Sequence, residues 1–134
     1  MKDNWLELYK ACNKELDNKD LTTFVNVGSS ACAILTDKGS IYVGKGIESN
    51  WKLNTCAEKS AIMNMLNKNE HVIKKMVILN ELEEEILPCR DCLNYLLEFD
   101  QTGDMDILTS YRNGEAVKLK DILPDDYGVV KIEG

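Results

Sequence analysis

The sequence has only two prolines, one histidine and no long apolar run among its 134 residues. Without Pro-rich or low-complexity tracts, the chain is neither fibrous nor built from flexible linkers. No apolar run approaches the roughly 18–20 residues that a membrane-spanning helix needs. The N-terminal residues lack the apolar stretch of a secretory signal, so we expect a cytoplasmic protein without a membrane partner.

Positive charge is also scarce. Lys and Arg number 16 against 23 Asp and Glu, which gives a net charge of −7. An acidic domain repels phosphate backbones, so we do not expect a nucleic-acid partner. The only histidine, His71, falls in a connection rich in Lys, Asn and Glu and is predicted to lie on the surface. The length fits a single domain over residues 1–134, whose core needs no disulfide bonds.

Apolar periodicity and turn residues predict alternating helices and strands. Thr55 is expected to cap a helix, with Glu58 in the capping-box position. Segments 44–53 and 80–87 are predicted to be irregular, the second as a solvated acidic loop. The expected elements are a helix at 5–16, strands at 31–36 and 40–43, a helix from 55, a strand at 75–79, a helix at 90–99, strands at 106–110 and 116–119, and a helical turn at 121–123. This order predicts a layered α/β sheet with helices on its faces.

Two short cysteine fragments stand at predicted helix starts: Thr55-Cys56-Ala57-Glu58 and Pro88-Cys89-Arg90-Asp91-Cys92. A helix N-terminus lowers the pKa of a cysteine and favours the thiolate, which is the form that binds zinc. The chain has five cysteines, and an odd number fits a closed disulfide framework poorly. In the cytoplasm, where thiols stay reduced, clustered cysteines indicate metal ligands before disulfides.

Three thiolates, from Cys56, Cys89 and Cys92, would leave one tetrahedral position of a zinc ion open, as in catalytic zinc sites. Zinc lowers the pKa of a bound water to about 7. Glu58 stands two residues past Cys56, where it can move protons without ligating the metal. The arrangement matches the general signature of zinc deaminases.

The cysteines also fit two other kinds of site. A closed structural site would need Cys12 or Cys32 as a fourth ligand, and both are predicted to be small buried hydrophobes. A redox Cys-x-x-Cys pair would leave Cys56 and Glu58 unexplained. Lys59 is either a cation that offsets the negative charge of the thiolates or an ordinary exposed lysine.

From about Ala31 to Tyr127, the chain resembles the small cytidine deaminases, including the blasticidin-S deaminase branch. The segments that carry the resemblance are Ile34 to Tyr42, Gly46-Ile47-Glu48, Cys56 to Ala61, Pro88 to Cys92, and Ile122 to Tyr127. The resemblance implies a three-layer α/β/α fold with a mixed five-stranded sheet. It also implies one Zn²⁺ per subunit, a small nucleoside as substrate, and a homotetramer or homodimer.

The resemblance assigns roles to particular residues. They are zinc ligation by Cys56, Cys89 and Cys92, proton transfer by Glu58, contact with the ribose by Glu48, entry into a neighbouring subunit's site by Tyr127, and a position close behind the zinc thiolates for Asn94. We further expect the backbone near Ala57 and Cys89 to hold the ring, and Lys59 is a candidate for a position behind the ligands. Four positions depart from the family pattern. Gly46 and Ser49 replace the asparagines around Glu48, Lys59 replaces an arginine, and the aromatic near the pyrimidine falls at Gly28, with Phe24 as its only nearby substitute.

We therefore expect zinc-dependent hydrolytic deamination of cytidine or deoxycytidine, with release of ammonia. The departures weaken the sugar and base contacts, so a specialised cytosine nucleoside such as blasticidin S is an alternative substrate. A non-catalytic, zinc-stabilised module of the same fold is a further alternative. Deamination within DNA or RNA is disfavoured by the acidic balance of the chain.

Overall fold

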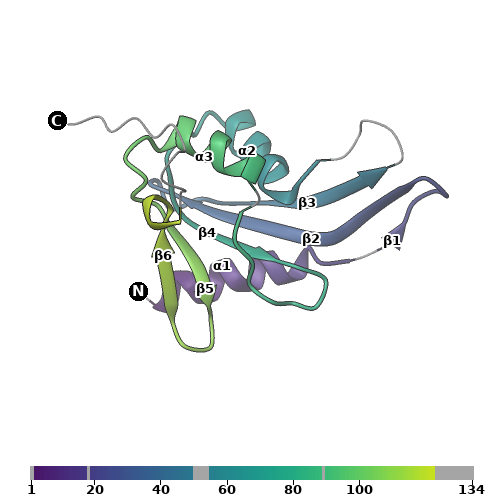
Figure 1. Ribbon diagram of the computed structural model, residues 1–134, viewed down its shortest axis with the longest axis horizontal. Coiled ribbons are helices and arrows are strands. Elements are labelled where there is room, and N and C mark those ends of the chain that lie inside the picture. The colour runs from purple at the N-terminus through teal and green to yellow at the C-terminus, as the bar shows by residue number, and fades with distance from the viewer. Residues whose placement is uncertain (1, 18, 50–54, 89, 123–134) are drawn as a thin grey trace.

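The computed structural model describes residues 2–17, 19–49, 55–88 and 90–122. The elements are α1 (Lys2–Lys14), β1 (Lys19–Asp20), β2 (Val25–Thr36), β3 (Ile41–Ser49), α2 (Ala57–Asn67), β4 (Ile73–Leu79), α3 (Arg90–Phe99), β5 (Asp106–Ser110), β6 (Glu115–Lys118) and a 3₁₀ turn at Leu119–Asp121. Strands and helices alternate through the middle of the chain (Figure 1). None of the helices within these ranges is long and apolar enough to cross a membrane.

The long strand β2 organises the sheet. One edge of β2 pairs antiparallel with β3 along most of its length. Its other edge pairs with β1 near the start of β2 and with β4 over the second half. Beyond β4 the sheet continues through β5 to β6. Among the described strands only β4 and β5 pair in parallel, with Lys75 opposite Asp106, so the sheet is mixed.

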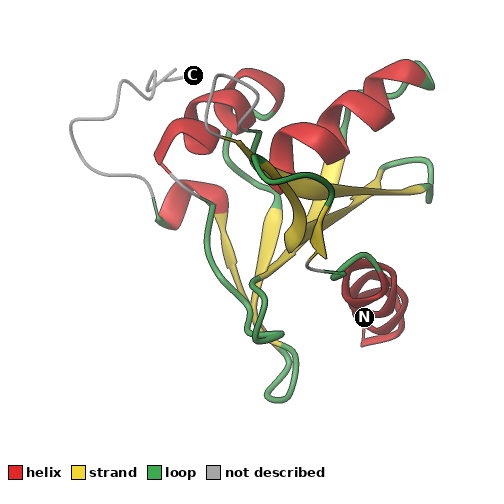
Figure 2. Cartoon of the chain, turned by 90° about the vertical axis from the view of Figure 1, so that its right-hand side faces the viewer, coloured by secondary structure: helices red, strands yellow, loops and turns green. Residues whose placement is uncertain are grey.

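Helices cover both faces of the sheet, with α1 on one face and α2 and α3 on the other (Figures 1 and 2). Successive side chains of a strand point to opposite faces, so each strand serves both layers. Ala33 of β2 packs with Leu8 of α1, whereas its neighbour Ile34 packs with Met65 of α2. The three-layer α/β/α architecture predicted from the resemblance is confirmed. The sheet has six strands rather than five because it includes the two-residue β1.

The sequence predicted the helix at 90–99 and the strand at 106–110 with their observed bounds. It missed β1 and the first part of β2. The prediction that 44–53 is irregular was wrong for 44–49, because β3 continues to Ser49, and residues 50–53 lie outside the described residues. Gly44 and Gly46 weaken the strand signal of that segment, since glycine disfavours strands. The surface position predicted for His71 is confirmed, because its side chain is exposed.

The predicted cap at Thr55 was also wrong. Cys56 is the N-cap of α2, and its side chain makes no capping hydrogen bond. Thr55 instead continues the sheet, because its backbone exchanges two hydrogen bonds with Ile47 of β3, at 2.8 and 2.9 Å. This pairing fixes where the chain turns from β3 into α2.

Candidate metal and substrate site

Cys56 and Glu58 lie at the start of α2. The residue before them, Thr55, is fixed by its backbone pairing with Ile47 of β3. Ala57 between them is buried against the core, and Glu58 is only 5% exposed. The unpaired N–H groups at a helix N-terminus attract negative charge, so this position suits a thiolate that binds a metal.

Cys92 reaches the same place from α3, where it is the third residue of the helix and is buried. One ligand atom each from Cys56, Glu58 and Cys92 lies within 4.8 Å of the other two. Residues 36 positions apart in the sequence thus meet at two neighbouring helix N-termini. Within the described ranges, these three side chains form the group of metal-ligating residues that the fold assembles.

The sulfur atoms of Cys56 and Cys92 are joined as a disulfide in the structure, but their Cα atoms are 7.7 Å apart. Disulfides usually span Cα separations of roughly 4.4–6.8 Å, so the backbone spacing is wide for such a bond. Two thiolates beside a carboxylate are a donor set that suits zinc, and the Cα separation is wider than a disulfide requires. The residues present therefore fit a zinc ion. The predicted third ligand, Cys89, lies outside the described residues.

The other two cysteines, Cys12 and Cys32, are buried free thiols. The Sγ of Cys12 donates to the carbonyl of Val77 on the α1 side of the sheet, across from α2 and α3. Burial raises the pKa of Cys12 to about 12. Burial, and then the negative charge of Glu58, raise the pKa of Cys32 well above its usual range. Neither belongs to the group at Cys56, so a four-cysteine structural site finds no support among the described residues.

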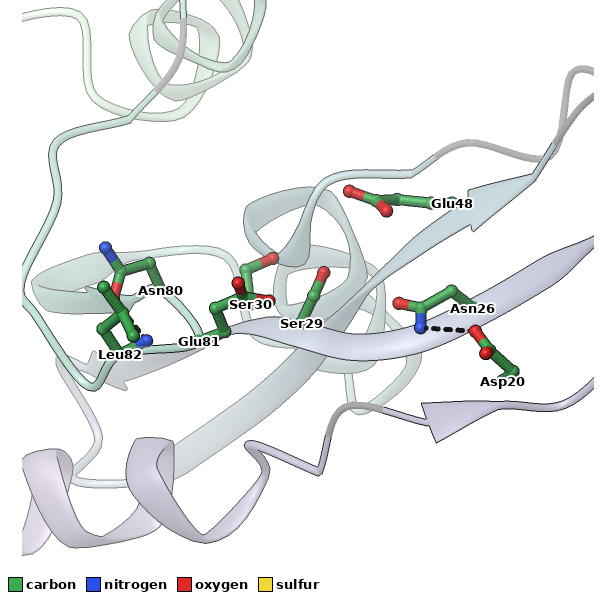
Figure 3. A pocket seen from close by; sticks show the side chains of 8 residues that line it. All are labelled: Asp20, Asn26, Ser29, Ser30, Glu48, Asn80, Glu81 and Leu82. Carbon is green, nitrogen blue, oxygen red and sulfur yellow. Dashed lines mark hydrogen bonds between the residues drawn. The ribbon is translucent and has the colours of Figure 1, made fainter.

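A polar trough of about 650 Å³ lies beside the strand end that leads to Cys56. Its lining residues are Asp20, Asn26, Ser29, Ser30, Glu48, Asn80, Glu81 and Leu82. Asn80 and Leu82 stand at one end and Glu48 and Asp20 at the other, with the two serines between them (Figure 3). Three of the lining side chains are carboxylic acids, and none of those within the described ranges is Lys or Arg. The trough therefore suits a ligand that is rich in hydroxyl or amino groups.

The sequence predicted only Glu48 among the residues of the trough. Glu48 lies opposite Asn26 in the β2–β3 ladder and directly follows Ile47, which pairs with Thr55. The other lining residues come from β1, β2 and the loop after β4, and nothing local in the sequence links those segments. The one available signal was Asn80, a polar residue that directly follows the apolar run 76–79 at the carboxyl end of β4.

The structure explains why no aromatic side chain stands at position 28. Gly28 has φ of +85°, and a Cβ there would come within 2.6 Å of the carbonyl carbon of Asp17. Glycine is the residue that tolerates both this backbone conformation and such an approach. Phe24, the expected substitute, precedes β2, is 60% exposed and does not line the trough.

Lys59 of α2 is half-buried and lies near residues of α3. The Nζ of Lys59 is 4.7 Å from the centre of the Tyr95 ring, a cation–π contact, and Asn94 is exposed. Both residues line a groove of about 370 Å³ together with Tyr95 and Glu98. The structure thus places Lys59 and Asn94 together in this groove. Tyr127 lies outside the described residues.

The mixed sheet defines an α/β protein, and the cysteine pair and buried glutamate at two helix starts form a candidate metal centre. No family model matches the chain. A cytidine deaminase of Sporosarcina psychrophila is 26% identical over 84 residues, which cover 62% of this chain and 61% of that protein. The cytidine deaminase of Mycobacterium tuberculosis superposes with a TM-score of 0.75 at 20% identity, over 92% of this chain and 97% of that chain.

The cytidine deaminase of Mycobacterium leprae gives a TM-score of 0.73 at 20% identity, over 90% of this chain and 98% of that chain. The fold is therefore that of the cytidine deaminases. The resemblance of the sequence to this family is confirmed by the bacterial relative and by these structures.

Proposed function

We propose that this protein is a zinc-dependent deaminase of a small cytosine compound, with cytidine or deoxycytidine as the first candidates. The convergence of Cys56, Glu58 and Cys92 within 4.8 Å at two helix N-termini carries the proposal. Cys56, Cys92 and, from the sequence, Cys89 would hold the zinc ion. When bound, zinc would make a water acidic enough to react near neutral pH.

In the proposed reaction, water adds at C4 of the cytosine ring, the bond from C4 to the amino group breaks, and the amine leaves as ammonia. Glu58 takes a proton from the water and passes it to the ring nitrogen. It then takes the second proton from the added hydroxyl group and delivers it to the leaving amine. Its burial at the start of α2 supports this role, because a carboxylate shielded from solvent keeps a fixed position and exchanges protons with its neighbours.

The polar trough is the proposed binding site for the sugar of the substrate. Glu48 would accept a hydrogen bond from a ribose hydroxyl, and Ser29 and Ser30 offer further partners along the trough. The backbone at Ala57 would contact the ring, because this residue joins Cys56 to Glu58. We also propose that the active form is a homotetramer or homodimer in which Tyr127 completes a neighbouring site, as the resemblance implies.

The acidic lining favours a second candidate substrate, a specialised cytosine nucleoside that carries a positive charge. Asp20, Glu48 and Glu81 surround the trough without a lysine or arginine among its described lining residues. A cationic substituent would gain from these carboxylates, whereas an anionic nucleotide would be repelled.

Release of ammonia from a panel of cytosine compounds tests the proposal. The panel contains cytosine, cytidine, deoxycytidine, cytidine monophosphate and a cationic cytosine nucleoside, each assayed with zinc-loaded and with chelator-treated protein. We expect turnover of at least one nucleoside, loss of turnover on chelation and recovery when zinc is restored. A folded protein that binds zinc but releases no ammonia from any compound would support the non-catalytic alternative, as would an X-ray absorption spectrum with four sulfur ligands.

A further inference from the structure

The loop between β4 and α3 is organised by one side chain, Asn80. Its Oδ1 accepts hydrogen bonds from the backbone N–H groups of Leu82, at 2.9 Å, and Glu84, at 3.0 Å. Its Nδ2 donates to Oε1 of Glu84 at 3.1 Å. The backbone of Asn80 also donates to the carbonyl of Glu84 and accepts from the N–H of Glu83, at 3.0 and 2.9 Å. The loop therefore closes on Asn80.

This closure keeps the turn in an unfavourable backbone conformation. Glu83 has φ of +63°, a left-handed conformation that residues other than glycine rarely adopt. The contacts of Asn80 with the residues on either side of Glu83 hold the chain there. Without them, the turn would relax toward more ordinary backbone angles and move its tip.

The tip of the turn is also a wall of the trough. Asn80, Glu81 and Leu82 line it at the end opposite Glu48 (Figure 3). The returning segment has anchors of its own, because Ile86 donates to the carbonyl of Ile78 at 2.9 Å and Glu85 accepts from the N–H of Tyr111 at 2.8 Å. These anchors hold the approach to α3 and Cys92 independently of Asn80.

We propose that Asn80 is a positioning residue that sets the substrate affinity of the trough. It acts through the turn, by fixing Glu81 and Leu82 opposite Glu48, while the zinc ligands stay in place through the separate anchors of the returning segment. This inference rests on the proposed deaminase function, since it assigns the trough to that substrate.

Steady-state kinetics with cytidine, or with whichever compound of the panel is turned over, test the inference on zinc-loaded protein. Asn80→Ala should raise KM several-fold and leave kcat and the bound zinc close to those of the unchanged protein. Asn13→Ala is the matched control, because Asn13 donates to Oε1 of Glu83 from α1 and does not line the trough. It should leave KM unchanged.

A swap of the donor and acceptor provides the rescue. Asn80→Asp alone keeps the acceptor for Leu82 and Glu84 but places two carboxylates together, so KM should rise. Adding Glu84→Gln restores the hydrogen bond with its direction reversed, because the amide at position 84 donates to the carboxylate at position 80. KM should then return toward the original value. This pair also tests the inference if Asn80→Ala fails to fold.

The outcomes separate this inference from the proposed function. An unchanged KM in Asn80→Ala, a fall in kcat without a change in KM, or a failure of the swap to restore KM would each overturn the role of Asn80 while the deaminase function stands. An unchanged protein that releases no ammonia would overturn the proposed function alone. The Kd for cytidine would then be compared between the unchanged protein and the same variants, in place of KM. An absence of binding would overturn the inference as well.

Discussion

Gly44 in β3 lies so close to Ala57, the first residue of α2, that a Cβ at Gly44 would sit 2.7 Å from the carbonyl oxygen of Ala57. The backbone nitrogen of Ala61, one turn further on, lies closer still. The glycine lets the helix that carries Cys56 and Glu58 rest directly on the sheet. This packing therefore stabilises the fold and also sets how deep the candidate metal group lies.

Replacing Gly44 by alanine should destabilise the fold and weaken zinc binding. The added methyl group meets backbone atoms, which cannot turn aside, so α2 must move; overpacking of this kind costs about 1–3 kcal/mol. Denaturant unfolding gives the loss of stability, and competition with a chelator gives the change in zinc affinity. Gly46→Ala is the control, because a Cβ there meets the hydroxyl of Ser30, which can rotate away. Equal effects of the two substitutions would contradict the argument.

The sequence predicted the parts of this arrangement that depend on local pattern. The helix at 90–99 has a clear apolar face, and the Cys56–Glu58 and Pro88–Cys92 fragments carry their spacing within a few residues. The trough could not be predicted in the same way, because its walls come from four segments whose meeting depends on the register of β2. The backbone conformation of Gly28, which excludes an aromatic there, becomes evident only when Asp17 is placed against it.

Chemical labelling should divide the cysteines into two classes. In folded, zinc-loaded protein, Cys12 and Cys32 should resist alkylation because burial raises the pKa of both and keeps them as thiols. Removal of zinc should make Cys56, Cys92 and the predicted ligand Cys89 reactive, because their thiolates lose the metal. Mass spectrometry of digested protein identifies which residues are modified.

The same labelling experiment distinguishes a metal site from a disulfide. Zinc-loaded protein that is denatured without reductant should have a mass matching five free thiols. Recovery of a linked peptide containing Cys56 and Cys92 from that protein would contradict the metal assignment. Alkylation of Cys12 before unfolding would contradict its burial in the α1 layer.

Acid should weaken the fold partly through Glu70, which joins the β2–β3 hairpin to the end of α2. The hydroxyl of Thr36 and then that of Tyr42, at 2.6 Å, donate to its carboxylate and lower the pKa of Glu70. A lowered pKa adds stability above the ordinary carboxyl pKa of about 4.3, and this contribution disappears as the pH falls through the folded-state value. The stability difference between the unchanged protein and Glu70→Gln should therefore shrink in acid.

Urea unfolding at a series of pH values measures that difference. Glu7→Gln serves as the control, because Glu7 is exposed on α1 and its carboxylate has no described hydrogen bond. Its effect should be small at every pH. A Glu70→Gln difference that stays constant from about pH 7 to about pH 3 would contradict the proposed linkage.

The decisive substitution for the chemistry is Glu58→Gln, which keeps the size of the side chain and removes its ability to carry a proton. Turnover should fall about 10²–10⁴-fold, the usual range for loss of a general acid–base group. Bound zinc should remain, because the cysteines hold it, and metal analysis of the purified variant checks this. Glu7→Gln again serves as the control and should retain full activity. Full activity of Glu58→Gln would exclude Glu58 as the proton carrier. Loss of zinc in that variant would show instead that the carboxylate contributes to holding the metal, since it lies within 4.8 Å of both sulfur atoms.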